Sequence, residues 1–314
     1  MLTFGPVSSR RLGKSLGINN ISHPKVCSYN CIYCQVGKTI RLTARPETFF
    51  EPEIIFNEVK NHLTHLGPEN FPDYMTFVAN GEPTLDINLG QTIRLLKKLE
   101  IPIAIITNGS LLSDKSVRKD VQLADWVSVK VDSPDQHTWN LLNRPYTGLS
   151  FDRHIEGILL FASEYKGFLC TETMILKGVN DDTEMFSKLA GIIEKLHPHK
   201  AYLSIPTRPP SVQSVEMPDI NKVNEVCRIF SEKQIRTEPL IGFEGTDIGY
   251  TGNIYDDLLN IIAVHPLRED ALRILLYQDK ADFSCVESLI RQKIINVVRY
   301  NGEKYYIRQY SDQI

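Results

Sequence analysis

Residues 26–35 read VCSYNCIYCQ and place three cysteines, Cys27, Cys31 and Cys34, within eight positions of one another. The chain holds six cysteines, and the other three are scattered along it. In a reducing compartment, clustered thiols bind metal or carry out chemistry more often than they pair as disulfides. The question for the function is which metal site or which reaction uses three thiolates close together and no fourth thiolate nearby.

The composition is that of an ordinary globular protein, with 314 residues, 42% of them hydrophobic, and a net charge of −3. This length suits one large α/β domain, or one large domain with a small one. The sequence has no run of 18 apolar residues, and its first residues lack the apolar core of a secretory signal. We therefore expect a cytoplasmic protein with no membrane partner.

The N-terminal segment is basic. The first acidic residue is Glu47, and seven basic residues precede it: Arg10, Arg11, Lys14, Lys25, Lys38, Arg41 and Arg45. Two interpretations stay open. The residues belong to a solvated surface, or they form an electropositive rim around an anionic cofactor or substrate.

Four kinds of cysteine site can be compared. A structural zinc site takes four ligands, and the next candidates here are His62 and His65, which lie three apart on a predicted helix and are expected at the surface. The odd number of cysteines argues against a disulfide, and a single nucleophile needs no close neighbours. A [4Fe–4S] cluster held by three thiolates fits best, since it leaves one iron open for a small molecule.

Downstream of the cysteines, apolar runs of strand length alternate with stretches of helical spacing. A first strand is expected near 16–21, and five more at 74–79, 103–107, 126–131, 168–176 and 201–205. Helices are expected between them, at 53–66, 89–99, 113–123, 151–165, 182–196 and 220–230. Alternating strands and helices form parallel βα units. The pattern predicts an α/β fold, a partial (β/α)6 barrel of the TIM type.

The pattern changes after 243–253 (FEGTDIGYTGN), which is rich in glycine and polar residues. Two helices are expected at 266–278 and 282–292, followed by a hairpin of strands 294–299 and 305–307 around an Asn-Gly turn. Two helices and a hairpin are typical of a winged helix. We therefore predict a barrel domain at 1–254 and a small winged-helix-like domain at 255–314.

Two further motifs follow predicted strands. The sequence NGEP occupies 80–83, directly after the strand at 74–79, and TNG occupies 107–109, after the strand at 103–107. Together with CxxxCxxC, in this order, they resemble the radical S-adenosylmethionine (SAM) superfamily over about residues 10–250. The resemblance implies an enzyme of the oxidoreductase or transferase type. In such enzymes a [4Fe–4S] cluster reductively cleaves SAM to a 5′-deoxyadenosyl radical, which abstracts hydrogen from a substrate.

The resemblance also implies residue roles. Cys27, Cys31 and Cys34 match the cluster ligands, and Tyr33 matches an aromatic position near the adenine of SAM. The NGEP motif matches the segment that holds the SAM amino group, and Asn108 belongs to a motif found in many members. The implied cofactor-binding residues of the two loops are Asn80, Gly81, Glu82, Pro83 and Asn108. Asn80 departs from the family pattern, because glycine is usual at that position.

Polar residues at the ends of later strands are further candidates, because barrel enzymes place their sites at the carboxyl ends of strands. Lys130 and Asp132 share one strand face and either reach the SAM ribose or carboxylate, or form a buried ion pair. Both interpretations stay open. The candidates for substrate contacts are Arg10, Arg11, Glu172 and Arg208.

The segments 4–18, 27–39 and 79–85 resemble a branch grouped with the tRNA wyosine-synthesis enzymes. Archaeal wyosine synthases carry a further cysteine set upstream, and no cysteine precedes Cys27 here. Wyosine synthesis itself is therefore not expected. The candidate partners are an electron donor such as ferredoxin or flavodoxin, and a macromolecular substrate, either RNA or a peptide or protein.

The predicted C-terminal domain holds eight basic and nine acidic residues, a poor balance for a nucleic-acid footprint. An alternative function is nevertheless considered. It is a regulator that senses an iron–sulfur cluster and binds DNA through the winged helix, which would leave the NGEP and TNG motifs without a role.

Overall fold

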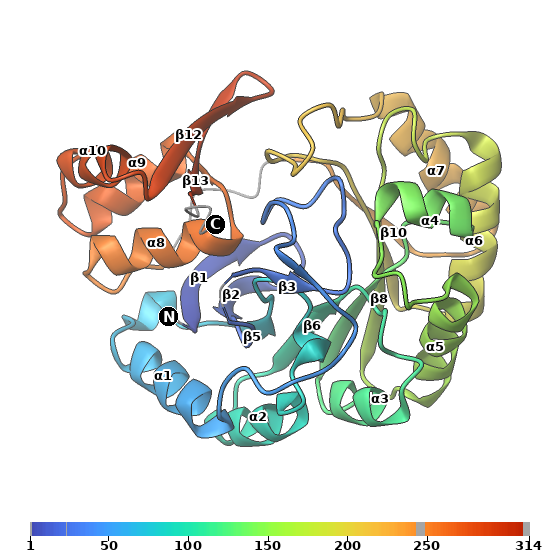
Figure 1. The fold of residues 1–314 in the computed structure, drawn as a ribbon, viewed down its shortest axis with the longest axis horizontal. Coiled ribbons are helices and arrows are strands. Elements are labelled where there is room, and N and C mark those ends of the chain that lie inside the picture. The colour runs from blue at the N-terminus through green and yellow to red at the C-terminus, as the bar shows by residue number, and fades with distance from the viewer. Residues whose placement is uncertain (1, 23, 243–248, 310–314) are drawn as a thin grey trace.

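The fold is built on one curled sheet of eight strands, which forms an open half-barrel (Figure 1). The structure, a computed structural model, describes residues 2–22, 24–242 and 249–309. In spatial order the strands are β1 (Thr3–Ser9), β2 (Gly13–Ile18), β5 (Tyr74–Phe77), β6 (Ile103–Thr107), β7 (Trp126–Lys130), β8 (Phe168–Met174), β9 (Lys200–Ser204) and β10 (Thr237–Leu240). The strands from β2 to β10 are parallel, and β1 closes one edge in the antiparallel direction.

Helices cover the outer face of this sheet (Figure 1). They are α1 (Pro52–Thr64), α2 (Leu89–Leu96), α3 (Lys115–Val121), α5 (Phe151–Glu164), α6 (Thr183–Leu196) and α7 (Ile220–Glu232). Each has an apolar stripe. Helix α6, for example, buries Phe186, Leu189, Ile193 and Leu196 at helical spacing. Because the strands are buried, they read as near-continuous apolar runs, which is why the sequence reveals them.

The predicted partial barrel is confirmed, with two differences in the strands. The six predicted strands are present within a few residues of their expected bounds, but the parallel sheet has a seventh member, β10, and an antiparallel edge, β1. Strand β10 reads TEPL, and its charged residue and proline suit an edge position. The same two residues interrupt any apolar run, so the sequence pattern did not predict this strand. A further short helix, α4 (Gln136–Leu142), follows β7 and was not predicted.

The C-terminal elements are α8 (Ile254–Val264), β11 (Leu267–Arg268), α9 (Glu269–Gln278), α10 (Ser284–Arg291), β12 (Ile295–Tyr300) and β13 (Glu303–Arg308). The three strands form a small sheet in the order β11-β13-β12. The turn between β12 and β13 has positive φ at Asn301 (49°) and Gly302 (82°), as a tight hairpin requires. Helix α8 was not predicted. The winged-helix assignment and the boundary near residue 254 stay predictions.

These elements cover the edge of the half-barrel. Phe4 of β1 belongs to the same buried apolar cluster as Leu258, Leu272 and Val286. Covering an edge strand in this way removes an open template for pairing with another chain. The glycine-rich segment 243–253 connects the two parts, and its residues 243–248 lie outside the described residues.

Some side chains lie differently from expectation. His62 was expected at the surface, but it is buried and contacts the Thr3 hydroxyl at 3.2 Å and the Gly5 carbonyl oxygen at 2.8 Å. Its helix α1 packs against β1, an unpredicted strand, which explains the error. Within the described residues, no helix combines the length and the apolar character needed to cross a bilayer.

Candidate functional site

The cysteine loop is joined directly to the NGEP loop. It begins with β3 (Val26–Cys27), which pairs with the short strand β4 (Arg41–Leu42). The Val26 amide donates to the Asn80 carbonyl oxygen at 3.3 Å, and the Glu82 amide donates to the Val26 carbonyl oxygen at 3.2 Å. Gly81 has φ +147°, and a Cβ atom there would lie 1.6 Å from the Val26 oxygen. Glycine is therefore required at this position for the two loops to meet.

Each of the three thiols has a nitrogen donor from a side chain outside the CxxxCxxC motif. The donors and distances are Lys25 Nζ to Cys34 Sγ at 3.1 Å, Asn143 Nδ2 to Cys31 Sγ at 3.5 Å, and Asn108 Nδ2 to Cys27 Sγ at 3.7 Å. Donors to sulfur stabilise the thiolate over the thiol. The loop is thus arranged to hold three negatively charged sulfurs.

Burial opposes the charged form of two of these thiols. Burial raises the pKa of Cys27 and of Cys31 to about 12. Burial alone would lower the pKa of Lys25, but the neighbouring thiols, Cys34 foremost, outweigh burial and raise it. Metal binding at such a site deprotonates the thiols.

Among the described residues, no three His, Cys, Asp or Glu side chains converge closely enough to hold a single metal ion. The thiolates of a multi-iron cluster bind different irons, so they do not need to converge on one point.

Glu82 is buried, and protein groups satisfy its carboxylate. Oε1 accepts from the Thr84 amide (3.1 Å), the Thr84 hydroxyl (2.7 Å) and the Thr107 hydroxyl (2.5 Å), while Oε2 accepts from the Asn108 amide (2.8 Å). Three of these four bonds go to Oε1 and one goes to Oε2. Burial raises the Glu82 pKa, against the effect of these bonds. Glu82 therefore ties the NGEP loop to the TNG turn, whose Asn108 contacts Cys27.

The same loop also carries an acceptor without a donor. Asn80 is buried, and none of the described residues donates to its Oδ1 atom. A buried acceptor without a donor is costly unless a ligand completes it. Pro83, the fourth residue of the motif, uses its carbonyl oxygen to accept from Asn20 Nδ2 at 3.0 Å. The open acceptor of the NGEP loop is thus Asn80, the residue that replaces glycine.

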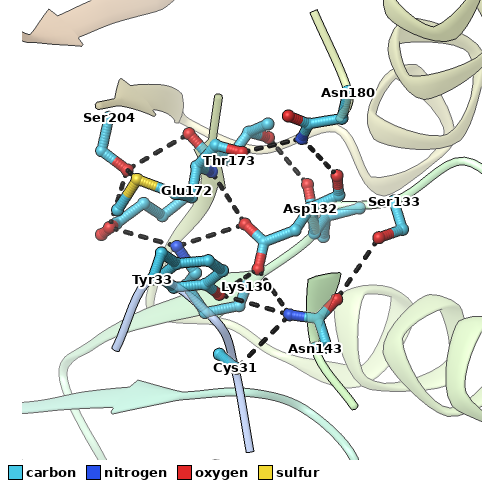
Figure 2. A network of polar contacts seen from close by, with 12 residues as sticks. Cys31, Tyr33, Lys130, Asp132, Ser133, Asn143, Glu172, Thr173, Asn180 and Ser204 are labelled. Atoms are coloured by element: carbon cyan, nitrogen blue, oxygen red, sulfur yellow. Dashed lines mark hydrogen bonds and ion pairs between the residues drawn. The ribbon is translucent and has the colours of Figure 1, made fainter. Parts of the chain in front are cut away.

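A second network lines the inside of the half-barrel and is centred on Asp132 (Figure 2). Its carboxylate accepts from the Tyr33 hydroxyl, from Asn143 Nδ2 at 2.9 Å and from the Met174 amide at 2.8 Å, and it lies 3.2 Å from Lys130 Nζ. The Lys130 ammonium also lies 5.0 Å from the centre of the Tyr33 ring. Through Tyr33 and Asn143, the network connects the barrel strands to the cysteine loop.

Lys130 also contacts Glu172, which pairs with Arg11. Glu172 Oε1 lies 3.4 Å from Lys130 Nζ and accepts from the Ser204 hydroxyl at 3.2 Å, while Oε2 forms an ion pair with the Arg11 guanidinium. Burial alone would raise the pKa of Glu172, but Arg11 and then Lys130 outweigh it and lower that pKa to about 2. Lys130 and Asp132 form an ion pair in this structure, which is one of the two interpretations that the sequence left open.

Glu172→Gln is expected to lower the free energy of unfolding by about 3 kcal/mol at pH 7. This is the free energy that corresponds to a Glu172 pKa lowered from 4.5 in the unfolded chain to about 2 in the folded protein. Because the folded pKa is depressed, this stabilisation is present above pH 4.5 and is lost as the pH falls toward 2. Urea unfolding of both proteins across this range tests it. Glu238→Gln is the control, since its pair with Lys200 is more exposed and should contribute under about 1 kcal/mol. A difference that persists at pH 2 would contradict the assignment.

The other arginines that the sequence singled out make contacts in different parts of the fold. Arg208 Nη1 donates to Gln35 Oε1 at 2.9 Å, which places it next to Cys34. Arg10 Nη1 donates to the Gly242 carbonyl oxygen at 2.9 Å, at the end of β10. Arg41 pairs with Glu47. Arg10 and Arg41 therefore make contacts in different parts of the fold.

Two contact residues were missed by sequence reasoning as members of the site. Lys25 was counted only among the basic residues, although its position two residues before Cys27 was a usable signal. Asn143 follows the short helix α4, which was itself not predicted, and no motif marks it.

Comparisons with known proteins agree with this fold. The model of the radical SAM superfamily matches residues 21–190. The chain is 42% identical to the UPF0026 protein MJ1312 of Methanocaldococcus jannaschii, over 98% of this chain and 96% of that protein. It is 30% identical to a UPF0026 protein of Helicobacter pylori, over 97% of both. A solved structure of TYW1 with a bound lysine–pyruvate adduct is similar in fold, with a TM-score of 0.54 and 18% identity, over 71% of this chain and 75% of that one. The chain therefore belongs to the radical SAM superfamily, together with the UPF0026 proteins.

Proposed function

We propose that this protein binds a [4Fe–4S] cluster through Cys27, Cys31 and Cys34 and uses it to cleave SAM for hydrogen abstraction from a substrate. Because the chain belongs to the radical SAM superfamily, it is an enzyme that carries out SAM-dependent chemistry. The observation that supports the cluster is the set of three thiols, each facing a nitrogen donor. A cluster with three protein ligands keeps one iron for SAM.

The residues around the thiols fit such a group. When bound, the cluster supplies the electron that breaks the sulfonium bond of SAM. Lys25, Asn108 and Asn143 hold the thiolates in place and spread their negative charge. The charge of Lys25 is retained in this role, because the negative charge of the surrounding thiolates, Cys34 foremost, outweighs burial and raises its pKa.

The NGEP loop fits the amino end of SAM. The open acceptor Asn80 Oδ1 is suited to an ammonium donor, and Gly81 holds it against the cysteine loop. Glu82 acts as a positioning residue, since its own hydrogen bonds are used within the protein. Tyr33 belongs to the cysteine loop and donates to Asp132, where its ring can flank the adenine. We propose Lys130 and Asp132 as polar contacts of the cofactor beside Tyr33.

The partners follow from this chemistry. We propose ferredoxin or flavodoxin as the class of electron donor, and RNA or a peptide as the expected macromolecular substrate. Arg11, Glu172 and Arg208 are the substrate candidates that face the barrel or the cysteine loop, whereas Arg10 lies at the end of β10. No contact described above favours the regulator alternative.

Anaerobic reconstitution with iron and sulfide, followed by SAM and dithionite, tests the proposal. We expect 5′-deoxyadenosine and methionine in amounts that depend on both the cluster and the reductant. A reconstituted protein that binds the cluster but releases neither product would contradict the proposed function. Salt-sensitive DNA binding by the same sample would then favour the regulator.

Asn143→Leu is expected to make the reduction potential of the cluster more negative by tens of millivolts. The reason is that hydrogen bonds to cluster sulfurs favour the reduced state, and Asn143 donates to Cys31. A redox titration followed by electron paramagnetic resonance measures this potential. Asn180→Leu is the matched control, because Asn180 is also buried and donates to the Asp132 carbonyl oxygen. Equal shifts in both variants would mean that Asn143 acts only through packing.

A further inference from the structure

One short segment contacts both the cysteine loop and the C-terminal hairpin. It comprises residues 206–212, follows β9 and reads PTRPPSV. Figure 1 shows the hairpin of β12 and β13 beside the opening of the half-barrel. Two adjacent prolines, Pro209 and Pro210, have fixed φ angles and make the middle of the segment stiff. The position of one end of the segment therefore affects the position of the other end.

The C-terminal end of this segment holds the backbone of the cysteine loop. The Ser211 hydroxyl lies 2.8 Å from the Cys31 carbonyl oxygen and 3.0 Å from the Ile32 carbonyl oxygen, so the two carbonyls share its proton. The Val212 amide donates to the Ile32 carbonyl oxygen at 3.0 Å. The Val212 side chain packs against the buried apolar cluster that contains Ile32. Ser211 and Val212 therefore fix the backbone between Cys31 and Cys34.

The N-terminal end of the segment is held by two tyrosines of the hairpin. The Tyr300 hydroxyl donates to the Pro206 carbonyl oxygen at 2.8 Å, and the Tyr305 hydroxyl donates to the Thr207 carbonyl oxygen at 3.1 Å. Tyr300 pairs with Glu303, two residues before Tyr305, so both tyrosine side chains lie on the same face of the hairpin. Burial raises the pKa of both tyrosines, and their hydroxyls therefore stay protonated donors at neutral pH.

Gln35, the residue after Cys34, joins the same parts of the fold by a second route. Its Oε1 atom accepts from Arg208 Nη1 at 2.9 Å, and its Nε2 atom donates to the Val264 carbonyl oxygen at 3.1 Å. Val264 is the last residue of α8, and the last carbonyl groups of a helix have no donor within the helix. Gln35 therefore ties the end of the cysteine loop both to the 206–212 segment and to α8.

We propose that Gln35 and Tyr305 are positioning residues for the iron–sulfur cluster, through which the C-terminal elements hold Cys31 and Cys34 in their binding geometry. Their side chains act on the cysteine loop through Arg208, Val264 and Thr207. The inference rests on the proposed function, because it takes these cysteines as the cluster ligands. It gives the C-terminal elements a role that the SAM chemistry alone does not assign to them.

Hydrogen–deuterium exchange of the full chain without its cluster tests this inference. Tyr305→Phe is expected to speed amide exchange in residues 31–37 at least about twofold, because a hydrogen bond that fixes the 206–212 segment is lost. Tyr165→Phe is the matched control. Tyr165 is 8% exposed and Tyr305 is 7% exposed, and the Tyr165 hydroxyl also donates to a backbone carbonyl oxygen, that of Ala124, at 3.0 Å. This bond joins the end of α5 to the residues before β7, so its loss should leave exchange in 31–37 unchanged.

Gln35→Met keeps the length of the side chain and removes both of its hydrogen bonds. It should speed the same exchange at least about fivefold, the factor that corresponds to one net hydrogen bond. In the reconstituted protein it should also speed iron release to a chelator and change the electron paramagnetic resonance signal of the reduced cluster. Gln122→Met is the control, since Gln122 donates to Glu164 between α3 and α5. Because Gln35 and Tyr305 both act through the 206–212 segment, the double variant Q35M/Y305F should show less than the product of the two single effects.

Unchanged exchange in residues 31–37 of folded Gln35→Met and Tyr305→Phe proteins would overturn the inference, as would equal acceleration by the two control variants. Circular dichroism verifies that each variant is folded, and Gln35→Met, at a half-buried position, decides the question alone if Tyr305→Phe does not fold. Wild-type cluster binding and SAM cleavage with unchanged exchange in the variants would refute only this inference. A wild-type protein that binds no cluster would refute the proposed function, and the exchange data would still decide whether the C-terminal elements hold the cysteine loop.

Discussion

Replacing any one of Cys27, Cys31 or Cys34 by Ala is expected to abolish the broad absorbance near about 400 nm of the reconstituted protein and to lower its iron content from about four per chain toward zero. Each thiolate holds a different corner of the cluster, so the remaining two cannot retain it. SAM cleavage should be lost with the cluster. Ultraviolet–visible spectra and iron analysis of anaerobically reconstituted protein measure both effects.

The three remaining cysteines provide the control for this experiment. Cys170 and Cys285 are buried and Cys227 is half-buried, and they lie on β8, α10 and α7. Cys227→Ala and Cys285→Ala should keep the full absorbance. Circular dichroism separates cluster loss from unfolding, because Cys27 also packs with Tyr29, Trp139 and Phe151. A folded Cys31→Ala protein with unchanged absorbance would mean that other residues bind the cluster.

Parallel strand order explains why the sequence predicts so much of the site. The carboxyl ends of β5 and β6 lie at one edge of the sheet, and motifs that follow adjacent strands must meet there. The NGEP and TNG motifs are therefore close, and the hydrogen bonds of Glu82 to Thr107 and Asn108 confirm their contact. The sheet itself was predictable because buried parallel strands are apolar throughout.

The contacts that the sequence did not predict join segments that lie far apart in the chain, and no local sequence pattern marks them. Asn143 reaches Cys31 across 112 positions, and Arg11 reaches Glu172 across 161. The second contact depends on the antiparallel pair β1 and β2, and β1 reads TFGPVSS, which has neither alternation nor an apolar run.

Glu82→Gln is expected to weaken SAM binding at least about tenfold while the absorbance near about 400 nm persists. Glutamine keeps the size of the side chain and one acceptor oxygen, but it turns an NH2 group toward the Asn108 amide or the Thr84 amide, where two donors then face one another. The TNG turn and the NGEP loop should therefore separate, which moves Asn80 from its place. Equilibrium dialysis with SAM measures the affinity.

Glu82→Ala should also weaken SAM binding, and in addition lower the free energy of unfolding by several kcal/mol, because up to four buried donors lose their acceptor at about 1–3 kcal/mol each. Asp86→Asn is the matched control. Asp86 is a buried carboxylate four residues later that accepts from the Asn88 amide and Asn20 Nδ2, outside the TNG turn. Its loss should reduce stability but leave SAM affinity unchanged. Should folded Glu82→Gln protein bind SAM as tightly as the wild type, the positioning role of Glu82 is wrong, since nothing else in its environment compensates for the lost carboxylate.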